Sequence, residues 1–85
     1  MNRTFELHYT EKFQKDAKSL DSASRKHLEH VIGKLLEDPH RFKPLKGYPL
    51  HYRLRFEKYR LIYKVEGEKI TLMLVRKRDE AYRTL

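Results

Sequence analysis

Alternating apolar and polar residues predict four β-strands in this chain. Phe5, Leu7 and Tyr9 alternate with polar residues near the beginning of the sequence. Three later runs have the same pattern: residues 52–56, 59–65 and 70–74. Every second side chain of a strand points to the same face, so each run has one apolar and one polar face. We therefore expect these segments to form a sheet with one buried face.

The segment between the first two runs has the spacing of two amphipathic helices. Thr10 is suited to cap the first helix, and Asp21 with Ser22 or Ser24 marks the beginning of the second. Pro39 ends the second helix. The apolar residues of the first helix are Phe13, Ala17 and Leu20. Those of the second helix are Leu28, Val31, Ile32, Leu35 and Leu36. Each helix thus has one apolar side that packs against another element.

This order of elements predicts an α+β fold in a single domain over residues 1–85. The order is strand, helix, helix, strand, strand, strand, followed by a short C-terminal segment. Three consecutive strands joined by tight turns favour a small, mainly antiparallel sheet, with both helices packed on one face. A chain of 85 residues has room for one modest core.

The sequence also indicates where the protein resides. It contains no cysteine, so it forms neither disulfides nor thiolate metal sites. No apolar run approaches the ~18 residues that a membrane-spanning helix needs, and the first residues lack the apolar region of a secretory signal. We expect a cytoplasmic protein without a membrane partner.

Positive charge is concentrated in the second half of the chain. The sequence has 20 Lys and Arg against 12 Asp and Glu, a net charge of +8. Residues 1–38 are balanced, whereas residues 41–64 hold eight basic residues and one acidic residue, Glu57. Such a concentration is typical of surfaces that bind nucleic-acid phosphates. The simpler interpretation is a solvated basic surface.

The second and third predicted strands form a hairpin that brings arginines together. With residues 57 and 58 as a two-residue turn, Arg55 lies opposite Arg60, and Arg53 shares their face, away from Leu54. Like charges opposite each other destabilise a sheet, and phosphate binding gives a reason for the cluster. The interpretation depends on register, because a shift of one residue moves every side chain to the other face.

The last predicted strand ends in Arg76, Lys77 and Arg78. In an antiparallel sheet this end returns beside Arg60. Tyr82 follows, with a phenolic oxygen suited to proton transfer and a ring suited to base stacking. The structural alternative is that Tyr82 packs the terminal segment onto the sheet.

Two stretches resemble the RelE/ParE superfamily of bacterial and archaeal toxins, and most closely its RelE branch. They are Tyr52–Tyr63 (YRLRFEKYRLIY) and Val75–Tyr82 (VRKRDEAY). Lys43–Gly47 (KPLKG) is similar to the loop that these toxins carry before the second strand. The element order agrees as well, so the resemblance covers nearly the whole chain.

The resemblance implies a RelE-like microbial RNase fold and a ribosome-dependent endoribonuclease that cuts mRNA in the A site and inhibits translation. It implies that Arg60, Arg78 and Tyr82 are catalytic, without metal or cofactor, in the attack of a ribose 2′-hydroxyl on its own phosphate. The expected RNA-binding residues are Arg53, Arg55, Lys46, Lys77 and Arg76. Family members have lysines where this chain has Arg53 and Arg55, and an arginine does not act as a base, so the general base stays open. Arg76 stands where many members have glycine, so Arg76 and Arg78 are alternatives for one role.

The resemblance also implies an inhibitory partner. We expect a cognate RelB-like antitoxin with an acidic, amphipathic segment, besides mRNA and ribosomal RNA. Two other classes stay open: a ParE-like toxin that inhibits DNA gyrase, and a non-catalytic member of the fold that binds nucleic acid.

The histidines carry a weaker signal. His27 and His30 are three residues apart on the second helix without a third ligand at suitable spacing, so a surface pair is expected rather than a metal site. His51 adjoins the basic strand and is interpreted as a solvated residue at the end of that strand; the alternative is a titratable group that assists at the site.

Overall fold

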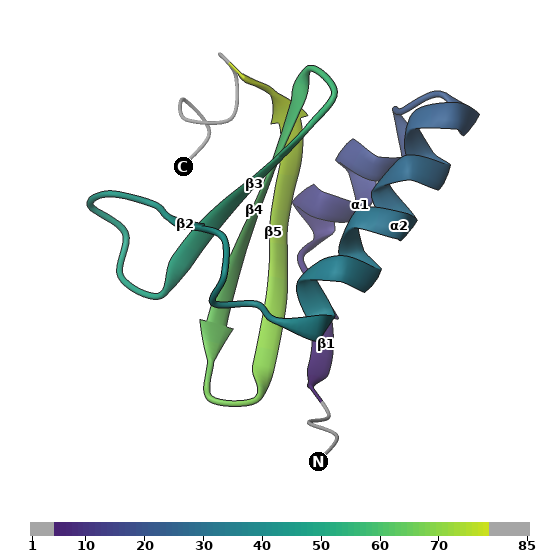
Figure 1. Cartoon of the computed structure of the whole chain (residues 1–85). Coiled ribbons are helices and arrows are strands. Elements are labelled where there is room, and N and C mark those ends of the chain that lie inside the picture. The colour runs from purple at the N-terminus through teal and green to yellow at the C-terminus, as the bar shows by residue number, and fades with distance from the viewer. Residues whose placement is uncertain (1–4, 79–85) are drawn as a thin grey trace.

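The computed structural model describes residues 5–78 of the chain. The elements follow in the order β1 (Glu6–Tyr9), α1 (Glu11–Lys18), α2 (Ser22–Glu37), β2 (Lys43–Pro44), β3 (His51–Phe56), β4 (Tyr59–Glu66) and β5 (Lys69–Lys77). The strands form one sheet in the order β1-β5-β4-β3-β2. Figure 1 shows α1 and α2 on the same face of this sheet. The predicted α+β architecture with two helices on one face is confirmed.

The sheet is mostly antiparallel, as the sequence predicted. β2–β3, β3–β4 and β4–β5 are antiparallel pairs, whereas β1 lies parallel to β5 at the opposite edge of the sheet from β2. The pairing of β4 with β5 shifts by one residue between Ile62 and Tyr63. β4 therefore lies in the interior of the sheet, with hydrogen-bonded neighbours on both sides.

The short strand β2 was expected to be part of a loop. It consists of Lys43 and Pro44, which pair with Arg53 and Tyr52 of β3. Two residues give no alternating pattern, and proline is usually absent from strands except at the edge of a sheet, where β2 lies. The pairing is therefore determined by the tertiary fold and not by the local sequence.

α1 begins at the capping residue that the sequence predicted, Thr10, and α2 begins at Asp21, one of the residues expected to mark its beginning. Thr10 accepts a hydrogen bond from the backbone N–H of Phe13 (3.0 Å), and its hydroxyl donates to the carbonyl oxygen of Met73 on β5 (2.7 Å). Asp21 accepts from the backbone N–H of Ser24 at 2.7 Å. These contacts satisfy N–H groups that have no partner within the helix. The Thr10 cap also attaches the beginning of α1 to the sheet.

The main core fills the space between the helices and the sheet. Its buried residues are Phe13, Leu20, Leu28, Val31, Leu35, Leu54, Phe56, Leu61, Tyr63, Val65, Ile70, Leu72 and Val75. A smaller cluster of Leu45, Ile62 and Leu74 covers part of the opposite face. Burial of each such side chain contributes about 1.5–3 kcal/mol, so the core determines which face of every strand is turned inward.

Tyr63 is the largest fully buried side chain of the core. Its hydroxyl donates to the carbonyl oxygen of Pro39 at 2.6 Å, and its ring stacks on Tyr52 with centroids 5.6 Å apart. Burial raises the pKa of the Tyr63 hydroxyl well above its usual value, because the charged form would lose its hydration. The hydrogen bond joins the end of α2 to the middle of the sheet.

Within residues 5–78, none of the helices combines the length and the apolar character needed to cross a membrane.

We expect Tyr63→Phe to lower the free energy of unfolding by about 1–2 kcal/mol, because the buried carbonyl of Pro39 loses its donor while the ring still packs. Tyr48→Phe is the matched control, since Tyr48 is 38% exposed. Urea denaturation of both variants measures the difference. Equal stability of the two variants would contradict a structural role for this hydrogen bond.

We expect Asp21→Asn to make stability less dependent on acid pH. The backbone N–H of Ser24 lowers the pKa of Asp21 below its usual 3.8, so the folded state favours the carboxylate. The stability that the charged Asp21 contributes is complete above the pKa that its carboxyl has in the unfolded chain. It is lost as the pH falls through the lower pKa of the folded state. Asparagine caps a helix without titrating.

Thermal melts from pH 7 to pH 2 should show that wild type is the more stable at neutral pH and that the difference disappears in acid. A constant difference over the whole range would show that the charge on Asp21 contributes nothing.

Candidate functional site

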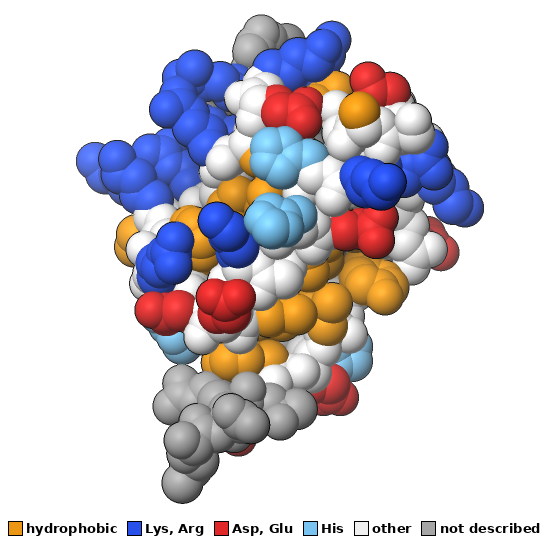
Figure 2. Space-filling model, turned by 45° about the vertical axis from the view of Figure 1, so that its right-hand side comes forward, with side chains coloured by type: hydrophobic (Ala, Val, Ile, Leu, Met, Phe, Trp, Pro, Cys, Tyr) orange, Lys and Arg blue, Asp and Glu red, His pale blue; other side chains and the backbone are white. Residues whose placement is uncertain are grey.

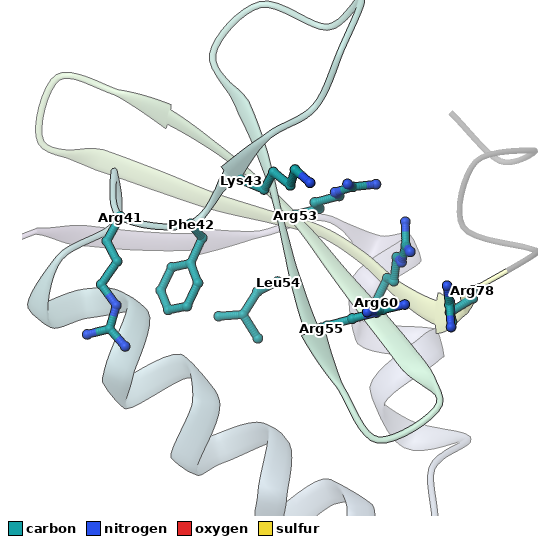
Figure 3. Close-up of a pocket in the computed structure, with 8 residues that line it drawn as sticks. All are labelled: Arg41, Phe42, Lys43, Arg53, Leu54, Arg55, Arg60 and Arg78. Carbon is teal, nitrogen blue, oxygen red and sulfur yellow. The ribbon is translucent and has the colours of Figure 1, made fainter.

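A cavity of about 620 Å³ lies at the edge of β3 beyond the end of β2. Of the eight described residues that line it, six are cationic and none is acidic: Arg41, Phe42, Lys43, Arg53, Leu54, Arg55, Arg60 and Arg78. Figure 3 shows Arg53, Arg60 and Arg78 on one side of β3, and Arg41, Phe42 and Leu54 on the other. We call these eight residues the arginine pocket.

The pairing of β3 with β4 assembles the centre of the arginine pocket. Arg55 lies directly opposite Arg60, and Arg53 lies opposite Ile62, as the two-residue turn predicted. Leu54 and Leu61 pair on the other face, where both are buried in the core. The burial of these leucines therefore fixes the face on which the arginines project.

Arg60 is the most buried cation of the pocket. Only 8% of its surface is exposed. Burial lowers the pKa of its guanidinium, and the like charges of Arg53, Arg78 and Arg55 lower the pKa further. The usual pKa of arginine is high enough that the group keeps its proton in neutral solution. A buried cation surrounded by like charges favours the binding of an anion, which offsets both effects.

Arg78 reaches the pocket from the end of β5. Its backbone N–H donates to the carbonyl oxygen of Lys58, in the turn between β3 and β4, at 3.2 Å. β5 runs antiparallel to β4, so the end of β5 returns beside Arg60. This is the proximity that the antiparallel order predicted.

The side of the pocket nearer to α2 was not predicted from the sequence. Arg41 and Phe42 come from the connection after α2, and the Arg41 guanidinium lies 5.1 Å from the centre of the Phe42 ring. Lys43 enters the pocket through the pairing of β2 with Arg53. The charge count included Arg41 and Lys43, but only tertiary pairing places them beside β3.

The structure places Arg76 outside the arginine pocket. Its Nε donates to both carboxylate oxygens of Asp16 on α1, each at 3.1 Å, and Asp16 also accepts from the backbone N–H of Val75 at 3.2 Å. β1 pairs with β5 only as far as Leu72, so α1 covers the remaining edge of β5. Arg78, rather than Arg76, is therefore the residue of this segment that lines the pocket.

The other predicted site residues lie apart from the pocket or outside the described residues. Lys46 is exposed in the loop between β2 and β3. Lys77 is exposed at the end of β5 and lines a separate depression with Asp16 and Arg76. Tyr82 is outside the described range 5–78. Of the predicted set, Arg53, Arg55, Arg60 and Arg78 are brought together.

The surface charge is unevenly distributed. In Figure 2 the largest group of Lys and Arg side chains lies at the upper left of the view, whereas acidic, histidine and apolar side chains occupy much of the remaining face. Residues 41–64, with eight basic residues and one acidic residue, supply most of the excess positive charge. An uneven field of this kind attracts a polyanion to one side of the molecule.

None of the described histidines lines the arginine pocket. His27 contacts Glu57 (Nδ1 to Oε2, 2.8 Å), and His51 contacts the carbonyl oxygen of Pro49 (2.8 Å). In the part of the chain from residue 5 to residue 78, no three His, Asp or Glu side chains gather as metal ligands do.

The arrangement is suited to binding a phosphodiester. Guanidinium groups donate paired hydrogen bonds that match phosphate oxygens, and they keep their charge when buried. Several such groups around one cavity also stabilise the additional negative charge that develops on phosphorus during transfer. Phe42 and Leu54 give the same pocket an apolar portion.

Comparison with known structures finds the same fold in toxins of toxin–antitoxin systems. A chain of the intact Escherichia coli RelBE toxin–antitoxin complex is 28% identical with a TM-score of 0.80, over 87% of this chain and 96% of that one. The isolated E. coli RelE toxin is 26% identical with a TM-score of 0.79, over 96% and 100%. A chain of the RelB–RelE complex of Methanococcus jannaschii is 26% identical with a TM-score of 0.75, over 92% and 98%.

Comparison with curated proteins finds no match. The family model of the ParE toxin of type II toxin–antitoxin systems (parDE) matches residues 7–82, nearly the whole chain. The superfamily that the sequence resembles is therefore confirmed. The chain belongs to the ParE toxin family, within the RelE/ParE superfamily, and has the fold of the RelE toxins.

Proposed function

We propose that this protein is the toxin of a type II toxin–antitoxin pair and that it cuts mRNA in the ribosomal A site. One observation carries the proposal: Arg60 is buried at the centre of a pocket that Arg53, Arg55 and Arg78 also line, with no acidic residue among the described residues around it. Such a pocket suits a phosphodiester better than a neutral ligand. The likeness to RelE toxins over most of the chain supports the same assignment.

The proposed reaction is a transesterification within the RNA. The ribose 2′-oxygen attacks the adjacent phosphorus as its proton passes to a base, and the bond from phosphorus to the 5′-oxygen breaks. The leaving 5′-oxygen takes up a proton. The products are a 2′,3′-cyclic phosphate and a free 5′-hydroxyl.

Each arginine has a proposed part in this reaction. Arg60 and Arg78 bind the non-bridging oxygens and stabilise the charge that develops there. Arg53 and Arg55 hold the neighbouring phosphates in register. The arginines do not accept the proton, because a guanidinium keeps its own. Tyr82 is proposed to accept the proton or to stack on a base.

The proposed dependence on the ribosome follows from the cationic residues of the pocket. A pocket of cations binds and stabilises phosphate but does little to align the 2′-oxygen for attack. Alignment contributes a large part of the rate in such reactions. The ribosome is proposed to supply it by holding the mRNA in a fixed conformation in the A site.

We also propose a cognate antitoxin of RelB type. The structural relatives include RelB–RelE complexes, in which toxin and antitoxin are bound together. Six of the eight residues of the arginine pocket are cationic, so an acidic segment of the antitoxin would cover it and exclude RNA. Lys43, which lines the pocket, and Lys46, which is exposed in the loop after β2, are proposed to contact mRNA and ribosomal RNA as well.

We expect Arg78→Ala and Arg60→Ala to reduce ribosome-dependent cleavage by about 10²-fold or more, the size of effect seen when one donor to a developing oxyanion is removed. Primer extension on an mRNA translated in a purified system measures the cuts. Lys34→Ala, which removes one exposed positive charge from α2, is the matched control and should cut like wild type.

Arg78 is exposed, so its replacement tests the pocket even if replacement of the buried Arg60 disturbs folding. Circular dichroism melts of all three variants establish which are folded. Full cleavage by folded Arg78→Ala and Arg60→Ala would remove the arginine pocket from the mechanism.

Inhibition of DNA gyrase is the second candidate function, and the match to the ParE toxin family favours it. We expect the folded protein to leave gyrase supercoiling unchanged at concentrations that cut mRNA, because the arginine pocket is suited to a flexible single strand. A supercoiling assay with purified gyrase makes the test. Gyrase inhibition without mRNA cleavage would show that the protein is a gyrase-inhibiting toxin and not a nuclease.

A further inference from the structure

The turn between β3 and β4 lies next to the arginine pocket. Phe56 pairs with Tyr59 around a two-residue turn, and the next pair outward is Arg55 with Arg60. The orientation of this turn therefore determines where two of the four clustered guanidinium groups lie. Whatever fixes the turn relative to the rest of the molecule also fixes these two groups.

Glu57 occupies an unusual position for its residue type. Its φ is +52°, in the left-handed region that favours glycine. The turn between β4 and β5 has the same two-residue form, since Glu66 pairs with Lys69, and there the corresponding position is Gly67 with φ +61°. The first position of the turn, with a similar positive φ, is thus glycine in one hairpin and glutamate in the other. Contacts of the glutamate side chain must therefore offset the conformational free energy that a positive φ costs at this residue.

The carboxylate of Glu57 binds α2. The hydroxyl of Ser24 donates to its Oε1 at 2.7 Å, and Nδ1 of His27 contacts its Oε2 at 2.8 Å. Ser24 is buried, and its backbone N–H is held by the capping residue Asp21. These two hydrogen bonds lower the pKa of Glu57, so the carboxylate stays charged in neutral solution. The tip of the hairpin is in this way attached to the first turns of α2.

The same turn also holds the end of β5. Lys58, the second turn residue, accepts a hydrogen bond from the backbone N–H of Arg78 at 3.2 Å. Arg55, Arg60 and Arg78 are therefore all close to the turn, either along the chain or through this bond. A movement of the turn relative to α2 would therefore displace these three arginines of the pocket together.

We propose that Glu57 is a positioning residue for the arginine pocket. By holding the β3–β4 turn on Ser24 and His27, it keeps the guanidinium groups of Arg55, Arg60 and Arg78 in place relative to the rest of the arginine pocket. Glu57 itself lies outside the pocket lining and touches no substrate in this proposal. The proposal rests on the proposed function for its link to RNA.

Replacement of Glu57 by glycine separates positioning from backbone strain. Glu57→Gly removes the carboxylate but suits a positive φ, so the hairpin still forms. Glu57→Gln keeps an oxygen that can accept the hydrogen bond from the Ser24 hydroxyl, but it removes the negative charge. Glu66→Gln is the matched control, because Glu66 is an exposed glutamate beside the other two-residue turn, at the far end of β4.

The probe is a short single-stranded 2′-O-methyl RNA, which binds but cannot be cleaved. We expect Glu57→Gly to weaken its binding by about tenfold, within the range that misplaced groups cause, while the melting temperature stays near that of wild type. Glu57→Gln should recover part of the affinity, and Glu66→Gln should bind like wild type. In the ribosome assay, kcat should fall more than KM rises.

A double-mutant cycle with Ser24→Ala tests the contact itself. Ser24→Ala should weaken RNA binding in wild type and have no further effect in Glu57→Gly, because both changes break the same attachment. NMR order parameters of the arginine Nε–Hε groups should show greater mobility of Arg60 in Glu57→Gly than in wild type.

Wild-type affinity in folded Glu57→Gly, or additive effects of the two replacements, would overturn the proposal. So would a folded wild type that does not bind the RNA. If wild type binds the RNA in a manner that depends on Glu57 but cuts no mRNA, the positioning role stands and the proposed nuclease function fails. If wild type and Glu57→Gly cut mRNA equally well, the function stands and the positioning role fails.

Discussion

The register between β3 and β4 is the constraint on which the rest of the structure depends. It pairs Leu54 with Leu61 on the face that α1 and α2 cover, and Arg55 with Arg60 on the other face. A slip of one residue would bury the arginines under the helices and expose the leucines. Each buried leucine contributes about 1.5–3 kcal/mol, whereas a pair of like charges across a sheet opposes folding by about 0.2–1 kcal/mol. The hydrophobic core thus holds together a charge cluster that would not form by itself.

Two carboxylates next to this sheet determine which cations remain available. Asp16 binds Arg76 and covers the edge of β5, so this arginine serves the structure. Glu57 binds α2 through Ser24 and His27, so the single acidic residue within residues 41–64 does not neutralise the pocket beside it. Both contacts connect a helix to the sheet. Together they leave the arginine pocket with six cations and no carboxylate among the described residues that line it.

Sequence periodicity predicts the parts of the site that lie on paired strands. The alternation through residues 52–65 and the two-residue turn are enough to place Arg53, Arg55 and Arg60 on one face, and antiparallel order is enough to bring Arg78 beside them. The contributions of Arg41, Phe42 and Lys43 depend on a strand of two residues, which has no period to detect. The position of Arg76 depends on where β1 ends relative to β5, a property of the tertiary structure. Local pattern therefore predicts the centre of the pocket and not its margin.

The choice of arginine over lysine at the centre of the pocket follows from its burial. Burial and three like charges lower the pKa of the group at position 60. A lysine there would start about two to three pKa units lower and would be more easily neutralised, whereas a guanidinium keeps its charge. Guanidinium groups that keep their charge suit phosphate binding over a wide range of pH, but they do not accept a proton. Charge stabilisation and proton transfer must then be performed by different residues, and of the expected catalytic residues only Tyr82 is not an arginine. In the proposed reaction the pocket therefore stabilises charge at phosphorus, and the group that accepts the proton comes from outside the set of clustered arginines.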